Sequence, residues 1–391
     1  MSAAVRVARD IVLVLAGTFV VLATLQSAIR STILPRAVRS SITRAVFVST
    51  RVVFRLRTGR SPSYERRDRI MAMYGPTTLL LLLSTWYVLL VVGYTALYLG
   101  IGVRGVGHAF MLSGSAVFTL GTTTTSDLVA NTLSYTEAGL GLLLLTLLIS
   151  YLPTLYGIFS QREASVAQLQ VRAGDPPTAT ALLIRYYRIG LTDRLSELWQ
   201  QWEGWFTLLE ESHTSFAILP FFRSPQPDQS WVTAAGTILD AGSLWASTVE
   251  HPNDPDAQLC IRAGFVALRR LGTYFNVPHP SDPAPTDPIT IAREEYDQAC
   301  AKLAAAGLPL RADREASWQS FSGWRVNYDT VLLNLARLVE APIAPWTSDR
   351  SPLTPEHTWT IKNSLRSRRR YRRRRALGPG SASEKTTTGR R

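Results

Sequence analysis

The chain has 391 residues and a formal net charge of +13, with 46% hydrophobic and 18% charged residues. The apolar residues gather in three blocks before residue 160, which excludes an ordinary soluble protein. Arginine supplies most of the positive charge, which suits either nucleic acid or an anionic membrane surface as a partner. Cys260 and Cys300 lack metal-ligand spacing, so we expect buried, reduced thiols instead of a disulfide.

Residues 11–29, 76–99 and 138–159 are each long and apolar enough to span a bilayer, for which about 20 residues suffice. A cleavable signal peptide is the alternative for the first of these segments. However, residues 30–75 carry eleven arginines, and arginine-rich short loops stay on the cytoplasmic side of a membrane. We therefore predict three membrane helices, with the N-terminus outside and the C-terminal half in the cytoplasm.

The first loop contains the stretch "SITRAVFVSTRVVFRLR", whose arginines Arg44, Arg51 and Arg55 fall on one helical face. Such a basic amphipathic helix is typical of segments that lie in the lipid headgroup layer. An ordinary positively charged cytoplasmic loop explains the arginines equally well. If the segment is an amphipathic helix in the headgroup layer, the sequence predicts that these three arginines contact lipid.

The second loop, residues 100–137, contains a single arginine, Arg104, and no lysine, so it is predicted to lie outside. It begins with a short apolar stretch at residues 107–118, which is too short to span a bilayer and suits a re-entrant half-helix. The polar sequence "TLGTTTTSDLV" follows at residues 119–129. A half-helix, a polar turn and a full helix in this order form a pore-loop arrangement.

This region resembles the pore of the potassium-channel superfamily, of the bacterial type with two helices and a pore loop. In the family pattern T-L-T-T-V-G-Y-G-D-L-V-P, six residues of this chain match: Thr119, Leu120, Thr122, Asp127, Leu128 and Val129. The resemblance covers residues 76–160. It implies a homotetramer around one central pore and monovalent cations as the conducted ions.

The filter glycines of the family are replaced in this chain by Thr124 and Ser126, and the filter aromatic residue is replaced by Thr125. A second register would place Gly121 on a filter glycine and Thr123 on the other, but it loses the match at Asp127. Glycine suits filters because their backbone angles are ones that β-branched residues resist. The pore could therefore be nonselective, selective for an ion other than potassium, or closed.

The resemblance assigns pore or filter positions to Thr119, Leu120, Gly121, Thr122, Thr123, Thr124, Thr125, Ser126 and Asp127. A ring of Asp127 carboxylates would concentrate cations at the outer mouth, although a helix N-cap is an alternative role for Asp127. Gly139 and Gly141 could be gating hinges or packing positions, and Pro153 would kink the inner helix. Glu137 is expected to begin that helix and to interact with its dipole.

The helical periodicity of the C-terminal half predicts an all-α bundle, with helices near residues 177–188, 230–249, 255–275, 286–306 and 313–340. Another helix carries an apolar stripe at spacings of 4, 3, 4, 3 and 4, with Thr192 as a possible cap. The stripe consists of Leu191, Leu195, Leu198, Trp202, Trp205 and Leu209. It is too short for a convincing coiled coil, so we expect a core helix.

Two polar features of this half have structural explanations that we prefer. Glu210 and His213 have di-iron spacing, but no second Glu-x-x-His pair accompanies them, so we expect no metal and place His213 at a helix end. Asp240, alone on an apolar helix, is expected to have a buried polar partner. No nucleophile elbow, phosphate loop or acid–base pair occurs in the sequence, so we predict neither an enzyme nor a cofactor.

The tail "RSRRRYRRRR" and the residues after it are predicted to be disordered, and the arginines either contact anionic lipids or simply anchor the membrane topology. Nucleic acid is a less favoured partner because no aromatic platform accompanies the arginines. The predicted lipid contacts are Arg368, Arg369, Arg370, Arg372 and Arg373.

The predicted fold is therefore an all-α membrane protein with three transmembrane helices, a re-entrant pore loop and a cytoplasmic bundle. The chain is divided into a membrane helix (1–30), a basic loop (31–75), a channel-like pore domain (76–160), a helical domain (161–365) and a tail (366–391). We expect a cation-conducting channel subunit of the plasma membrane. The alternative is a non-conducting receptor or scaffold derived from a channel.

Overall fold

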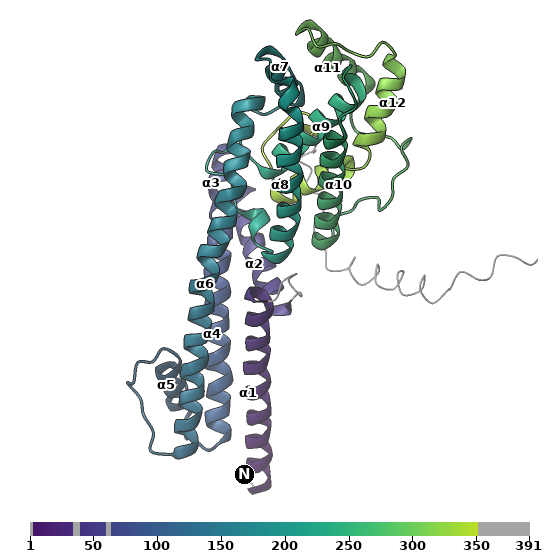
Figure 1. The fold of residues 1–391 in the computed structure, drawn as a ribbon. Helices are drawn as coiled ribbons and strands as arrows, with labels where there is room; N and C mark the ends of the chain where they lie inside the picture. Colours follow the sequence, from purple (N-terminus) through teal and green to yellow (C-terminus); the bar gives the residue numbers. More distant parts are fainter. Residues whose placement is uncertain (1–2, 34–39, 60–63, 351–391) are drawn as a thin grey trace, which may run out of the picture. The chain divides into compact units, whose positions relative to one another are not determined.

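The computed structural model describes residues 3–33, 40–59 and 64–350, all of which belong to one compact unit. These residues form helices and connecting loops without a strand, apart from an isolated bridge between Val249 and Leu310 (Figure 1). The prediction of an all-α fold is confirmed for this part of the chain.

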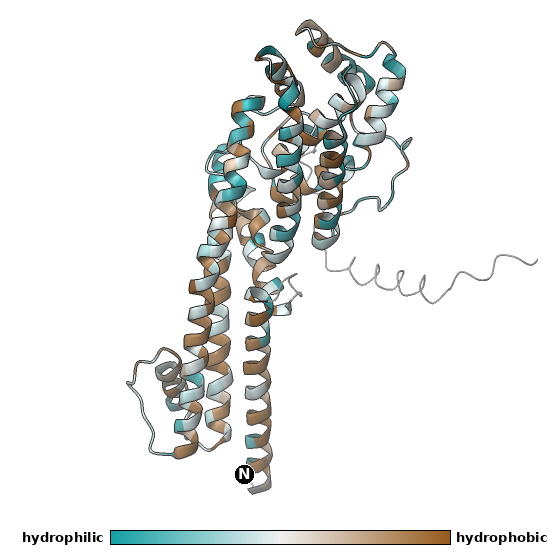
Figure 2. Cartoon of the chain, viewed as in Figure 1, coloured by the Kyte–Doolittle hydropathy of each residue, from teal (hydrophilic) through white to brown (hydrophobic). Residues whose placement is uncertain are grey.

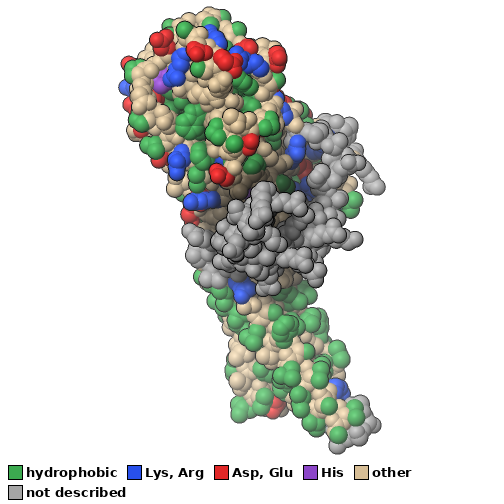
Figure 3. Space-filling model, turned by 90° about the vertical axis from the view of Figure 1, so that its right-hand side faces the viewer, with side chains coloured by type: hydrophobic (Ala, Val, Ile, Leu, Met, Phe, Trp, Pro, Cys, Tyr) green, Lys and Arg blue, Asp and Glu red, His purple; other side chains and the backbone are tan. Residues whose placement is uncertain are grey.

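Three helices are long and apolar enough to cross a membrane: α1 (Ala3–Thr32), α4 (Tyr74–Gly100) and α6 (Leu128–Ala173). Their hydrophobic residues form the brown lengths in Figure 2. Figure 3 shows a corresponding apolar surface on one face of this part of the molecule, whereas charged side chains gather over the C-terminal helices. The structure is thus compatible with the predicted three-pass membrane protein.

Helices α1 and α4 pack closely because glycines face each other across their contact. A Cβ atom added to Gly17 would lie 2.6 Å from the carbonyl oxygen of Gly93, and one added to Gly100 would lie 2.6 Å from Val14 Cγ2. Small residues let two helix backbones approach in this way. Trp86 of α4 also donates to Ser27 Oγ of α1 at 3.1 Å, so the pair is joined by a buried polar contact as well.

The basic segment between α1 and α4 forms α2 (Ser41–Thr58) and α3 (Tyr64–Ala72), and α2 begins with Ser40 as its N-cap. Tyr74, at the start of α4, packs edge-on against Phe54 of α2 and Phe221. Its hydroxyl donates to the carbonyl of Phe47 at 3.2 Å. These aromatic contacts join α2 and α4 to the short helix η2 (Leu219–Phe221) of the C-terminal part.

Helix α6 differs from its prediction at both ends. It begins at Leu128 instead of residue 138, because Asp127 caps it ten residues earlier, and it runs unbroken to Ala173. The predicted division of the chain at residue 160 therefore falls inside a helix. Helix α6 also continues through Pro153, which removes one backbone donor but leaves the preceding and following turns helical.

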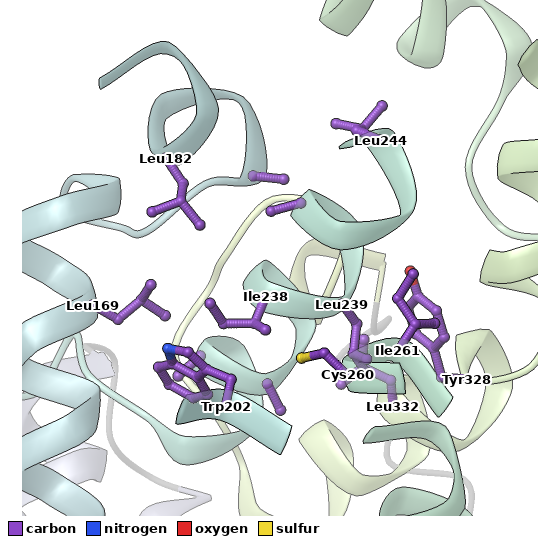
Figure 4. Close-up of a cluster of buried hydrophobic side chains, with 14 of the residues drawn as sticks. Leu169, Leu182, Trp202, Ile238, Leu239, Leu244, Cys260, Ile261, Tyr328 and Leu332 are labelled. Atoms are coloured by element: carbon purple, nitrogen blue, oxygen red, sulfur yellow. The ribbon is translucent and has the colours of Figure 1, made fainter. Parts of the chain in front are cut away.

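The C-terminal helices surround α9, in which every residue except Ala246 is buried. Figure 4 shows part of this core, with Ile238 and Leu239 of α9 in one cluster with Trp202 and Ile261. The helices of this part are α7 (Ala179–Arg188), α8 (Leu195–Ser215), α9 (Trp231–Thr248), α10 (Pro255–Phe275), α11 (Arg293–Ala305), α12 (Arg314–Arg325) and α13 (Asp329–Val339). Single turns η1 (Thr192–Arg194) and η3 (Ser348–Arg350) complete it.

The predicted helix at 255–275 is confirmed at both ends. Five residues of the predicted apolar stripe lie on α8 and are buried in the core, whereas Leu191 precedes η1 and is half-buried. Three details were wrong. Residues 313–340 form two helices, because the chain turns at residues 326–328. Helix α11 begins at Arg293, after a proline-rich approach, and not at residue 286. Thr192 lies within η1 and does not cap α8.

Candidate functional site

The short helix α5 (Val106–Val117) precedes the threonine segment and packs against both α4 and α6. Its contact with α6 is close at one glycine, since a Cβ atom on Gly141 would lie 2.4 Å from the carbonyl oxygen of Val117. Tyr87 of α4 donates to the carbonyl of Gly141 at 2.7 Å and stacks on Phe118. Gly141 thus has a packing role, whereas a Cβ atom on Gly139 would meet nothing within 4 Å.

The first half of the threonine segment is anchored to Ser115 of α5. The carbonyl of Ser115 accepts a hydrogen bond from the backbone of Leu120 at 2.8 Å, and its hydroxyl accepts one from Thr123 at 3.1 Å. Thr119 and Gly121 have φ values of 54° and 66°. Glycine adopts this left-handed backbone readily, but a β-branched threonine does so only under strain.

The second half of the segment is organised around Asp127. The carboxylate of Asp127 accepts a hydrogen bond from the backbone of Ala130 at 2.9 Å, which is an N-cap contact. Its own backbone nitrogen donates to Thr125 Oγ1 at 3.2 Å, and Asn131 donates to the Thr125 carbonyl at 2.9 Å. The capping role that was left open for Asp127 is therefore present, and its side chain remains exposed.

Most of the predicted filter side chains lie at the surface of the single chain. Only Thr123 and Thr125 are half-buried, and the rest of the set is exposed. The exposed members are Thr119, Leu120, Gly121, Thr122, Thr124, Ser126 and Asp127. The segment is thus a polar loop, joined to α5 and α6 by backbone contacts, whose hydroxyls and carboxylate are available to solvent or a neighbouring chain.

Glu137 does not begin α6, as the sequence had suggested, but lies in its third turn and is fully buried. Its carboxyl group contacts Ser113 Oγ of α5 at 2.5 Å and accepts from Tyr98 of α4 at 3.1 Å. Sequence reasoning missed this cluster. The signal was the spacing, because Glu137 lies four residues before Gly141 and seven after Ala130, on the buried face of α6.

A different face of α6 is exposed and bears hydroxyl groups among its leucines. Each hydroxyl donates to a carbonyl three or four residues earlier in the same helix, and the hydroxyl of Thr136 also lies 3.0 Å from that of Tyr94 in α4. These residues are Thr132, Thr136, Thr146, Ser150 and Thr154. Only 11% of the apolar 18-residue stretch of α6 is buried, so this helix offers a large surface to lipid or to other chains.

The arginines of α2 contact protein as well. Arg51 donates to the carbonyl of Leu338 at 2.5 Å and lies over the ring of Phe221. Arg55 lies 3.6 Å from Glu340, just after α13. The exposed apolar residues of the same helix are Val48, Val52, Val53 and Leu56. Lipid contact by Arg44, Arg51 and Arg55 stays a prediction, and that of the tail arginines lies outside the described residues.

The two polar features of the C-terminal half have protein partners. Glu210 pairs with Arg270 at 2.9 Å, and Arg162 of α6 donates to His213 Nε2 at 3.1 Å. Burial, and then the nearby Arg162 charge, holds the pKa of His213 well below its usual range. Asp240 is buried against Arg325, which confirms the prediction of a polar partner. Within the described ranges, no cluster of three acidic, histidine or cysteine side chains could hold a metal ion.

No known family model matches this chain, and neither a curated protein nor a solved structure matches it.

Proposed function

We propose that this chain is a subunit of a plasma-membrane ion channel, in which the threonine segment lines the narrow part of a pore for monovalent cations. The observation that carries the proposal is the order α5, exposed polar segment, α6, with α5 packed against two apolar helices. Non-helical backbone at membrane depth is stable only when protein or a water-filled cavity surrounds it. A pore loop meets that requirement.

The exposed surface of α6 supports an assembly of several copies. Its hydroxyl-bearing face suits a water-filled pathway, and its leucines suit contact with lipid or a neighbouring subunit. Four copies, as in the family that the sequence resembles, would bring four threonine segments to one axis. The proposed assembly is therefore a homotetramer.

Within such an assembly, Thr122 would supply a hydroxyl and Asp127 a negative charge near the outer mouth. Asp127 can do so while it caps α6, because the cap contact uses Oδ2 and leaves the side chain exposed. The threonines at the positions of the filter glycines favour a pore that is not strictly selective for potassium.

The proposed topology places the threonine segment outside and the C-terminal helices in the cytoplasm. In this orientation α2 lies at the inner surface, where its apolar residues Val48, Val52 and Leu56 suit the headgroup layer. Its arginines and those of the tail would then be near anionic lipids.

A non-conducting receptor or scaffold is the alternative. It is favoured by the strained backbone of Thr119 and by the capping role of Asp127, both of which suit a stable surface loop. In that case the C-terminal helices would carry the function, and α5 would serve only to support the loop.

Purified protein in planar bilayers tests the proposal. We expect cation-dependent single-channel currents, with a conductance at low salt that falls severalfold in Asp127→Asn. Asparagine caps a helix about as well as aspartate, so this variant removes the charge and keeps the cap. Asp10→Asn is the matched control, since it removes a charge on the same proposed side, on α1 beside Gly100 and outside the threonine segment. Silence at all voltages and salts tested would favour the scaffold.

A further inference from the structure

The carboxyl group of Glu137 joins three helices at one buried point. Glu137 itself belongs to α6, its Oε1 lies 2.5 Å from Ser113 Oγ of α5, and its Oε2 accepts from Tyr98 of α4 at 3.1 Å. All three side chains are buried, and Glu137 and Ser113 have no exposed surface. The cluster is therefore isolated from water within the chain.

Counting protons at Ser113 indicates the state of the carboxyl group. Ser113 Oγ also lies 3.2 Å from the carbonyl oxygen of Val91, which can only accept a hydrogen bond. A hydroxyl carries one proton, so it cannot donate to Val91 and to Glu137 together. Both contacts are satisfied when Glu137 is protonated and donates to Ser113, which in turn donates to Val91.

The absence of a nearby cation among the described residues also favours a protonated Glu137. None of the ion pairs among the described residues includes Glu137. On α4 the titratable groups near it are Tyr94 and Tyr98, and on α5 the titratable side chain is His108, which is exposed. An ionised carboxylate without a cation is far more costly to bury than a neutral acid.

The cluster is connected to the threonine segment through α5. Ser113 is two residues before Ser115, whose backbone and hydroxyl oxygens hold Leu120 and Thr123. A shift of α5 away from Glu137 would therefore move the anchor of the segment. We propose that Glu137 is a neutral carboxylic acid that positions α5, and through α5 the threonine segment, for ion conduction. The part that concerns conduction rests on the proposed function.

Infrared spectroscopy of the reconstituted protein tests the protonation state without any measurement of current. At neutral pH, the wild type minus Glu137→Gln difference spectrum should contain the carbonyl stretch of a protonated carboxylic acid. Carboxylate bands in its place would overturn the proposal. Should Glu137→Gln fail to fold, Ser113→Ala supplies a second test, because loss of that hydrogen bond should shift the same band to higher frequency, and an unchanged spectrum would overturn the assignment.

Bilayer currents test the positioning role. Glutamine can donate to Ser113 and accept from Tyr98, so Glu137→Gln should conduct within about twofold of the wild type. Glu137→Ala removes both contacts and should lower the open fraction about tenfold or more. Equal loss in both variants would overturn the positioning role. A protonated-acid band in a protein that passes no current would refute the proposed function and leave the neutral acid in place.

Discussion

Arg325 and Asp240 form a buried ion pair across the C-terminal core, with 2.5 Å between Arg325 Nη1 and Asp240 Oδ1. Their side chains are 0% and 2% exposed, and they are 85 residues apart in the chain. Arg325 also pairs with Asp329 at 2.8 Å and donates to the carbonyl of Trp346. Tyr328 adds a hydrogen bond to Asp240 at 3.0 Å. One guanidinium thus connects α9, α12, α13 and the segment after α13.

Replacing Arg325 by methionine should therefore destabilise the protein strongly. The substitution leaves the carboxylates of Asp240 and Asp329 buried without their cation, which costs about 3–5 kcal/mol. Tryptophan fluorescence during denaturation in detergent measures the change in the free energy of unfolding. Arg270→Met is the matched control, because the Arg270–Glu210 pair is largely exposed on the arginine side and should contribute at most about 1 kcal/mol. Similar losses in both variants would contradict the prediction.

His213 should make the stability depend on pH. The Arg162 guanidinium can only donate, so His213 Nε2 must keep its lone pair, and burial lowers the pKa of this histidine well below 6.5. The unfolded chain binds a proton there below about pH 6.5 and the folded chain does not. The free energy of unfolding should therefore fall as the pH drops below that value, by up to about 1.4 kcal/mol per pH unit.

Unfolding curves between about pH 7 and 5 check this dependence. His213→Gln should flatten the curve, because it removes the group whose pKa differs between the folded and unfolded chain. A slope that His213→Gln does not alter would assign the pH dependence to other groups.

Gly141 and Gly139 should respond differently to alanine. A methyl group on Gly141 would collide with the Val117 carbonyl, so Gly141→Ala should push α5 away from α6 and lower the melting temperature. Gly139→Ala meets no neighbouring atom and should stabilise the helix by about 0.5–1 kcal/mol. Melting curves of the two variants test this difference. A lower melting temperature in Gly139→Ala would indicate a contact with another copy at that position.

Arg223 should couple the linker helix α3 to the end of α13. It lies 2.5 Å from Asp68 Oδ1 and donates to the carbonyl of Val339 at 3.1 Å, and both charged side chains are nearly buried. A double-mutant cycle with Asp68→Asn and Arg223→Met should give a coupling energy of about 1.5–3 kcal/mol. The more exposed Arg270–Glu210 pair, which has no contact with Arg223, provides the comparison and should give less than about 1 kcal/mol. Equal coupling in the two cycles would be inconsistent with the burial of Asp68 and Arg223.

Local patterns were sufficient for much of the architecture. Long apolar runs predicted α1, α4 and α6, a short one predicted α5, and a regular apolar spacing predicted the buried face of α8. The predicted range 255–275 coincides with α10. These features depend on residues within a few turns of one another, so they can be recognised without knowing the neighbouring helices.

The packing between distant residues could not be predicted in this way. Glu137 had the sequence features of a helix start, and its burial depends on Ser113 and Tyr98 from two other helices. Asp240 was expected to have a partner, but its identity as Arg325 required the fold. Hydrophobic periodicity shows which face of a helix is covered, whereas the covering side chain is chosen by contacts between segments far apart in the chain. For this physical reason the helices could be predicted from the sequence, and the polar clusters that join them could not.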